Sequence, residues 1–149
     1  MNLEREDGYR ISTDPALLDR ERIWRFLTES YWARGIPRDL LDRAIDRSLP
    51  FGLFAPDGSQ AGFARAVTDG ETFAWIGDLF VLSEHRGKGL GVWLTESLLG
   101  HPDLAGIRKV VLATADAHEL YRRFGFEAAD AERLMEIART PEQAYGDAG

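Results

Sequence analysis

A short run of glycines and basic residues, Arg86-Gly87-Lys88-Gly89-Leu90-Gly91, has the composition of an anion-binding loop. Three glycines on alternate positions leave backbone N–H groups uncovered, so that the loop can close around a phosphate. Apolar residues at helical spacing follow, and a helix N-terminus adds its positive end at the same place. We therefore expect residues 86–92, Val92 included, to bind a pyrophosphate. An ordinary glycine-rich connection between a strand and a helix is the alternative.

Two other phosphate-binding motifs fit this glycine loop (residues 86–91) less well. A dinucleotide-binding fingerprint needs glycine at position 92, where this chain has Val92. A Walker loop needs serine or threonine directly after the lysine, and Gly89 follows Lys88. The glycine spacing therefore disfavours a nucleotide-binding α/β module.

Asp78 is the one formal charge in the apolar segment 74–81 that precedes the loop. A carboxylate in such surroundings can have a raised pKa and act as a general base. Pairing with an arginine, or accepting hydrogen bonds at a strand irregularity, explains the residue equally well. Both interpretations of Asp78 remain open from the sequence.

A second group of residues lies about thirty positions after the glycine loop, from Asp116 to Phe126. Asp116 can cap a short helix, and Gly125 can end it before a strand begins at Phe126. Leu120, Tyr121 and Phe124 fall on one side of that helix.

Together, Arg86-x-x-Gly89-x-Gly91 and Leu120-Tyr121-x-x-Phe124-Gly125-Phe126 resemble two signature elements of the GCN5-related N-acetyltransferase (GNAT) superfamily. The resemblance implies a mixed α/β, mainly antiparallel sheet of six or seven strands, flanked by about four helices. The sheet would splay open between the 72–81 and 109–114 strands, with Gly77 at a bulge that starts the opening. Acetyl-CoA would lie in this opening as the acetyl donor.

The resemblance also implies which residues contact the coenzyme. The pyrophosphate would lie on the glycine loop, and the pantetheine would run along one strand end. Thr114 stands where family members often have asparagine, so Asp116 is an alternative contact at the helix start. The implied coenzyme contacts are Leu79, Phe80, Val81, Arg86, Gly87, Lys88, Gly89, Leu90, Gly91, Val92, Thr114, Asp116 and Tyr121.

The implied reaction is direct transfer of an acetyl group to a primary amine of a small molecule or peptide. A backbone N–H near Phe80 would stabilise the oxyanion, and Tyr121 would donate a proton to the departing thiolate. A phenol of pKa about 10 can serve a thiolate of pKa about 8.5 at neutral pH. Asp78 or a water chain would deprotonate the amine. Tyr121 as a core aromatic is the structural alternative.

The acceptor pocket is expected at the joint of the first two helices, residues 29–37. Tyr31 and Trp32 are adjacent aromatics before a glycine and a proline, which suits a loop folding over the opening. We predict that Tyr31, Trp32 and Trp75 line the pocket, with membership of the hydrophobic core as the alternative for each.

Local patterns predict the elements that position these residues. Strands are expected over 9–12, 51–55, 60–67, 72–81, 109–114, 126–129 and 134–138. Helices are expected from Asp14 to Thr28, from Pro37 to before Pro50, over 92–99 and over 117–124.

The composition sets the remaining expectations. The 149 residues suit one domain over 1–140 followed by a polar tail over 141–149. The absence of cysteine excludes disulfides and thiolate chemistry, no residue spacing indicates a metal site, and the net charge of −7 disfavours nucleic-acid binding. No apolar run suits a membrane, so we expect a cytoplasmic location, with a homodimer as the assembly. A non-catalytic acyl-CoA-binding or sensing domain is the alternative function.

Overall fold

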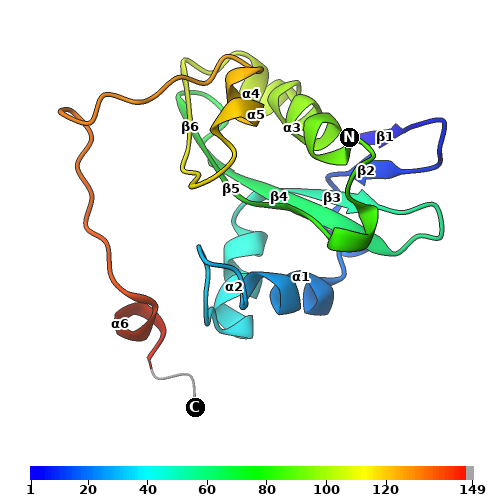
Figure 1. The fold of residues 1–149 in the computed structure, drawn as a ribbon, viewed down its shortest axis with the longest axis horizontal. Helices are drawn as coiled ribbons and strands as arrows, with labels where there is room; N and C mark the ends of the chain where they lie inside the picture. Colours follow the sequence, from blue (N-terminus) through cyan, green and yellow to red (C-terminus); the bar gives the residue numbers. More distant parts are fainter. Residues whose placement is uncertain (147–149) are drawn as a thin grey trace.

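The computed structural model describes residues 1–146, and its strands form one sheet in the order in which they occur in the chain (Figure 1). Neighbouring strands are antiparallel, except that β5 and β6 are parallel. The predicted mixed, mainly antiparallel sheet is therefore confirmed. The strands are β1 (Asn2–Glu4), β2 (Arg10–Ser12), β3 (Leu49–Phe54), β4 (Gln60–Thr68), β5 (Phe73–Val81) and β6 (Lys109–Leu112).

Helices cover both faces of the sheet (Figure 1). One face carries α1 (Arg20–Leu27) and α2 (Arg38–Asp46), and the other carries α3 (Leu90–Leu99). The shorter helices are α4 (Pro102–Ala105), α5 (His118–Arg122), α6 (Pro141–Tyr145) and two 3-10 turns, η1 (Pro15–Leu17) and η2 (Ser83–His85).

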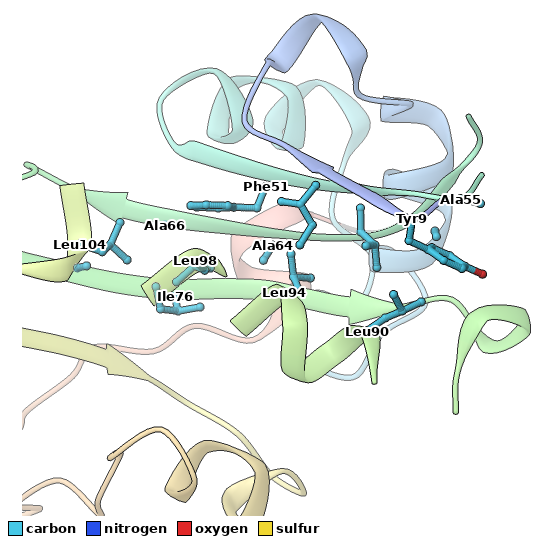
Figure 2. Close-up of a cluster of buried hydrophobic side chains, with 14 residues drawn as sticks. Tyr9, Phe51, Ala55, Ala64, Ala66, Ile76, Leu90, Leu94, Leu98 and Leu104 are labelled. Carbon is cyan, nitrogen blue, oxygen red and sulfur yellow. The ribbon is translucent and has the colours of Figure 1, made fainter. Parts of the chain in front are cut away.

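Each face of the sheet has its own hydrophobic core. On the α3 side, Leu90, Leu94 and Leu98 repeat every four residues and pack on small residues of the sheet such as Ala64 and Ala66 (Figure 2). On the other side, α1 and α2 bury apolar residues against Phe63 and Phe80. The sheet thus forms the middle layer of three.

A β-bulge in β5 decides which of its residues face which core. Arg65 pairs with Gly77 and Phe63 pairs with Phe80, so β5 has one residue more than β4 between these pairs. As a result Ile76 contributes to the α3 core, whereas Phe80, four residues later, contributes to the α1/α2 core. Without the bulge, residues four apart on a strand would share a face.

Asp78 lies in this bulge and has a left-handed backbone with φ of +57°. The sequence pointed to Gly77 as the bulge residue, but glycine's conformational freedom is not used there. Glycine at this position instead leaves room for the indole of Trp75, because a Cβ here would lie 3.3 Å from the indole Nε1.

The first predicted helix is divided in two. Asp14 caps η1 and Asp19 caps α1, each by accepting a hydrogen bond from a backbone N–H, so a second helix begins directly after Asp19. Elsewhere β3 begins at Leu49 and includes Pro50, which the sequence placed before the strand. The hairpin strand β1 was not predicted, because its residues are exposed and only the pairing of Leu3 with Ile11 and its neighbours defines it.

The two strands predicted near the C-terminus are absent. Residues 126–129 and 134–138 have an extended or irregular backbone with no hydrogen-bonded partner strand, although their composition suits strands. Helix α6 occupies the start of the segment predicted as a polar tail, held by a capping box between Thr140 and Gln143. The last three residues of that tail, 147–149, lie outside the described part of the chain.

Among residues 1–146, no helix is both long enough and apolar enough to cross a lipid bilayer. Within the same residues, no three histidine or acidic side chains gather in a way that would hold a metal ion.

Candidate functional site

The sheet opens between β5 and β6. Their parallel ladder joins Phe73–Ile76 to Lys109–Leu112 and ends there. Strand β5 continues to Val81, and over 77–81 its backbone pairs only with β4 in the described part of the chain. The opening therefore exposes one edge of the 77–81 segment, which contains the expected contacts Leu79, Phe80 and Val81.

The glycine loop lies between the end of β5 and the start of α3. Gly87 and Gly89 have φ of +83° and +71°, which L side chains rarely adopt. A Cβ at Gly87, Gly89 or Gly91 would meet nothing within 4 Å, so these glycines do not serve close packing.

The start of α3 offers free hydrogen-bond donors. Gly89 precedes the helix without a side-chain cap, and Leu90, Gly91 and Val92 form its first turn. Within residues 1–146, no protein acceptor is recorded for the backbone N–H groups of these first-turn residues. An uncapped N-terminus of a ten-residue helix behind an open glycine loop fits a pyrophosphate.

The N-terminal hairpin supports the glycine loop, a contact that sequence reasoning missed. Arg5 Nη1 donates to the Lys88 carbonyl at 3.1 Å, and the Lys88 ammonium lies 5.5 Å from the Tyr9 ring centroid. The Tyr9 hydroxyl also hydrogen-bonds His85 Nδ1 at 2.8 Å. Arg86 Nε donates to the Val81 carbonyl at 3.1 Å, which ties the loop to the end of β5. Arg5 lies 83 residues from Lys88 in the sequence, so no local pattern signals this contact.

Asp78 forms a nearly buried ion pair. Arg65 Nε donates to Asp78 Oδ2 at 2.6 Å, with side-chain exposures of 19% and 8%, and Arg65 Nη1 donates to the Ser48 hydroxyl at 3.0 Å. The second carboxylate oxygen of Asp78 accepts from Trp32 Nε1 at 3.0 Å. Both oxygens of Asp78 are therefore engaged, an arrangement that favours the arginine-pairing interpretation over a free general base.

Tyr121 lies on α5, at the far side of the opening from the glycine loop. Burial raises the pKa of its phenol above the ordinary value, and the nearby Tyr31 phenol and Asp116 carboxylate raise it further. Tyr121 also lines a pocket of about 350 Å³ together with β6 and residues 126–129. A phenol with a raised pKa stays protonated at neutral pH and can donate a proton.

The loop between α1 and α2 reaches both sides of the opening. Trp32 contacts Asp78 on β5, while the Tyr31 hydroxyl accepts the Ala115 N–H at 3.2 Å in the loop after β6. Their ring centroids are 5.1 Å apart and the rings are nearly perpendicular; Tyr31 is mostly exposed and Trp32 is less than half exposed. Trp75 is partly exposed on β5, with its indole over Gly77. Of the three expected acceptor residues, Trp75 and Trp32 thus lie at segment 75–78 of β5. Tyr31 lies beside Trp32, in the loop between α1 and α2.

Thr114, and not Asp116 as the sequence suggested, holds the start of α5. The Thr114 hydroxyl accepts the Ala117 N–H at 3.0 Å and so holds the start of α5, whereas the Asp116 side chain caps nothing. The Asp116 carboxylate is exposed and raises the pKa of Tyr121.

Comparisons with known proteins agree with this geometry. The model of the acetyltransferase (GNAT) family matches residues 17–126. A Gibberella zeae protein named as an acetyltransferase is 36% identical over 136 residues, which span 76% of this chain and 75% of that protein.

Two solved structures extend the comparison. The crystal structure of a GNAT-family protein from Xanthomonas campestris pv. campestris is 46% identical, covers 89% of this chain and 94% of its own, and superposes with a TM-score of 0.84. A Clostridium acetobutylicum protein described as a predicted acetyltransferase with acetyl-CoA is only 14% identical, covers 87% of this chain and 94% of its own, and shares the fold with a TM-score of 0.61.

Proposed function

Since this chain belongs to the GNAT acetyltransferase family, we propose that it transfers an acetyl group from acetyl-CoA directly to a primary amine of a small molecule or peptide. The observation that carries the proposal is the opened edge of β5, with an anion-binding loop at one end and a protonated phenol across from it. Two substrates can meet in such an opening, which suits transfer through a ternary complex.

The glycine loop and the first turn of α3 would hold the pyrophosphate of the coenzyme. Their free N–H groups and the charges of Arg86 and Lys88 supply the attraction. Acetyl-CoA would supply the activated acyl group, and the Clostridium acetobutylicum protein is the one whose crystal structure is described with acetyl-CoA. The backbone of Leu79–Val81 would bind the pantetheine, and an N–H near Phe80 would stabilise the developing oxyanion.

Tyr121 is the proposed acid. Its raised pKa keeps the phenol protonated at pH 7, so that it could donate a proton to the thiolate as the bond between carbon and sulfur breaks. The amine must lose a proton before it attacks. A water chain through the opening could take this proton, and Asp78, whose two oxygens already accept from Trp32 and Arg65, is the alternative base.

A non-catalytic acyl-CoA sensor is the second candidate function, because a loop that can hold the pyrophosphate serves a binder as well as a catalyst. Replacing Tyr121 by phenylalanine separates the two. For a catalyst we expect kcat to fall by about 10²–10⁴ while the Kd for acetyl-CoA changes less than twofold. A sensor would give no amine-dependent release of CoA in either form.

The first measurement is calorimetric titration with acetyl-CoA, with ATP and NAD as controls. Saturable binding of acetyl-CoA alone supports both candidate functions, and an amine library then tests for turnover. Absence of binding would refute both. We further propose that the enzyme is cytoplasmic, that it acts as a homodimer, and that it needs no nucleic acid, membrane or metal.

A further inference from the structure

Arg5 is the side chain through which the N-terminal hairpin reaches the glycine loop and the start of α3 (Figure 1). It directly follows β1, and its Nη1 donates to the Lys88 carbonyl at 3.1 Å. The guanidinium also lies 5.2 Å from the ring centroid of Trp93 on α3 and 5.7 Å from that of Tyr9. One guanidinium therefore contacts the hairpin, the loop and the helix that follows the loop.

The position of Arg5 is itself fixed. Its Nε and Nη2 both donate to the Asp7 carboxylate. The Arg5 N–H donates to the Tyr9 carbonyl at 2.9 Å, and the Gly8 N–H donates to the Arg5 carbonyl at 3.0 Å, which closes the hairpin turn. Tyr9 is buried in the core on the α3 side (Figure 2). Arg5 thus reaches the loop from a turn that is anchored in the core.

The acceptor of this hydrogen bond lies in the most flexible part of the loop. Lys88 stands between Gly87 and Gly89, which both have positive φ, and glycine has the largest conformational freedom of all residues. Within residues 1–146, no N–H of residues 87–89 donates to a protein acceptor. In the same part of the chain, the bond from Arg5 is the one recorded hydrogen bond to the Lys88 carbonyl.

Restraining this carbonyl also sets the direction of the Gly89 N–H. The two groups belong to one planar trans peptide, in which C=O and N–H point to opposite sides. Gly89 is left-handed, with φ of +71° and ψ of +18°, and Leu90 begins the right-handed α3. Alternation of left-handed and right-handed residues turns successive N–H groups toward one concave side, which attracts anions. The Gly89 N–H is the first of these donors.

We propose that Arg5 is a positioning residue for the coenzyme: by holding the Lys88 carbonyl, it directs the Gly89 N–H toward the pyrophosphate before the coenzyme arrives. The inference rests on the proposed function, because it concerns the loop that would hold the pyrophosphate. Without Arg5, the peptide between two glycines would rotate freely. Coenzyme binding would then have to order that peptide as well, which costs conformational entropy.

The role of Arg5 is distinct from that of a free positive charge. Its guanidinium is paired with Asp7, so the pair has no net charge. Arg10, an exposed arginine of β2 in the same hairpin, forms no ion pair within residues 1–146. Replacing Arg10 therefore removes an unpaired charge near the loop, whereas replacing Arg5 removes the restraint on the Lys88 peptide.

Calorimetric titration with acetyl-CoA measures the effect on binding. Arg5→Ala is expected to raise the Kd by about 5- to 30-fold, because one further peptide unit must be ordered. Arg5→Lys keeps a donor for the Lys88 carbonyl and should give an intermediate Kd. Arg10→Ala is the matched control and should change the Kd by less than about twofold, since an exposed charge is screened by salt.

Backbone relaxation measured by NMR in the free protein tests the same point without coenzyme. In the wild type, the N–H order parameters of residues 87–89 are expected near about 0.85, the value of a rigid backbone. In Arg5→Ala they should fall below about 0.6, while those of α3 stay unchanged. Unchanged values in α3 also show that the variant keeps its fold.

A double-mutant cycle separates the carbonyl of Lys88 from its ammonium group. Lys88→Ala removes the side chain and keeps the carbonyl that Arg5 contacts. The increase in Kd caused by Arg5→Ala should therefore be the same, within about twofold, in the wild type and in Lys88→Ala. An increase that disappears in Lys88→Ala would mean that Arg5 acts through the lysine side chain, which contradicts the inference.

Two further results would overturn the inference. One is a Kd of Arg5→Ala within about twofold of the wild-type value, with order parameters that do not change. The other is an equal loss of affinity in Arg10→Ala, which would assign the effect to charge alone. A wild-type protein that binds no acetyl-CoA would instead refute the proposed function, and the role of Arg5 toward the coenzyme with it. The two failures are therefore distinguishable.

Discussion

Replacing Asp78 by alanine or by glycine separates its ion pair from its backbone conformation. Both changes remove the carboxylate that Arg65 and Trp32 contact, so both leave the Arg65 guanidinium without its partner. Only glycine adopts a φ of +57° without a steric penalty. The difference between the two variants therefore reports the cost of the left-handed backbone at the bulge.

The structure gives the size of each contribution. Removing one partner of a buried ion pair costs about 3–5 kcal/mol, and the partial exposure of Arg65 places this case near about 3. Alanine in the left-handed region adds about 1–2 kcal/mol. We expect Asp78→Ala to lose about 4–5 kcal/mol and Asp78→Gly about 3 kcal/mol.

This order is the reverse of the usual one, because glycine within a strand is ordinarily about 0.5–1 kcal/mol less stable than alanine. Urea unfolding followed by far-ultraviolet circular dichroism measures it. With a slope of about 2 kcal/mol per molar urea, the Asp78→Gly midpoint should lie about 0.5–1 M above that of Asp78→Ala.

Val67 on β4 supplies the matched control. It is an exposed strand residue with no positive φ, so Val67→Gly should be less stable than Val67→Ala. The strain argument is refuted if alanine at position 78 equals or exceeds glycine in stability. The ion-pair argument is refuted if both variants lose less than about 1 kcal/mol.

Two further changes test the ends of β5. Hydrogen bonds from the Thr72 hydroxyl and from the N–H groups of Thr72 and Glu71 lower the pKa of Asp69, so its contribution to stability is present above about pH 4 and is lost as the pH falls. The difference in unfolding free energy between the wild type and Asp69→Asn should hold from pH 7 to about pH 5 and shrink below about pH 4; a difference independent of pH contradicts this. At the other end, Trp32→Ala should raise the KM for the amine while the Kd for acetyl-CoA stays constant, and Trp32→Phe, which keeps one aromatic ring but loses the hydrogen bond to Asp78, should have an intermediate effect. An unchanged KM in folded Trp32→Ala would exclude Trp32 from the acceptor pocket.

Local sequence patterns were sufficient to predict a helix or strand whose formation depends mainly on its own residues. The apolar repeat of α3 and the turn signals around β3, β4 and β5 correctly predicted those elements, because burial and turn chemistry are encoded within a few residues. The glycine loop was predicted for the same reason, since its conformation depends on glycines that lie within a few positions of one another.

Contacts between distant segments were not predictable in this way. Arg65 as the partner of Asp78 depends on the register of β4 and β5, which the bulge alters. The support of Lys88 by Arg5 depends on where the N-terminal hairpin packs. The strands predicted over 126–129 and 134–138 are wrong because strand-forming composition does not by itself supply a hydrogen-bonded neighbour, and neither segment pairs with a strand among residues 1–146.

The bulge of β5 also bears on how the length of this protein can vary. Deleting one residue between Ile76 and Phe80 would remove the bulge but leave these two residues three positions apart, so simple alternation would keep Phe80 in the α1/α2 core and Ile76 in the α3 core. In the β3–β4 turn around Gly58, where an added Cβ would meet nothing, the loss or gain of a residue would leave both cores in place. Insertions and deletions are therefore expected in such turns and at the bulge among functional variants, whereas a one-residue change in the regularly paired part of β5, Ala74–Gly77, would exchange the two faces of the strand on one side of it.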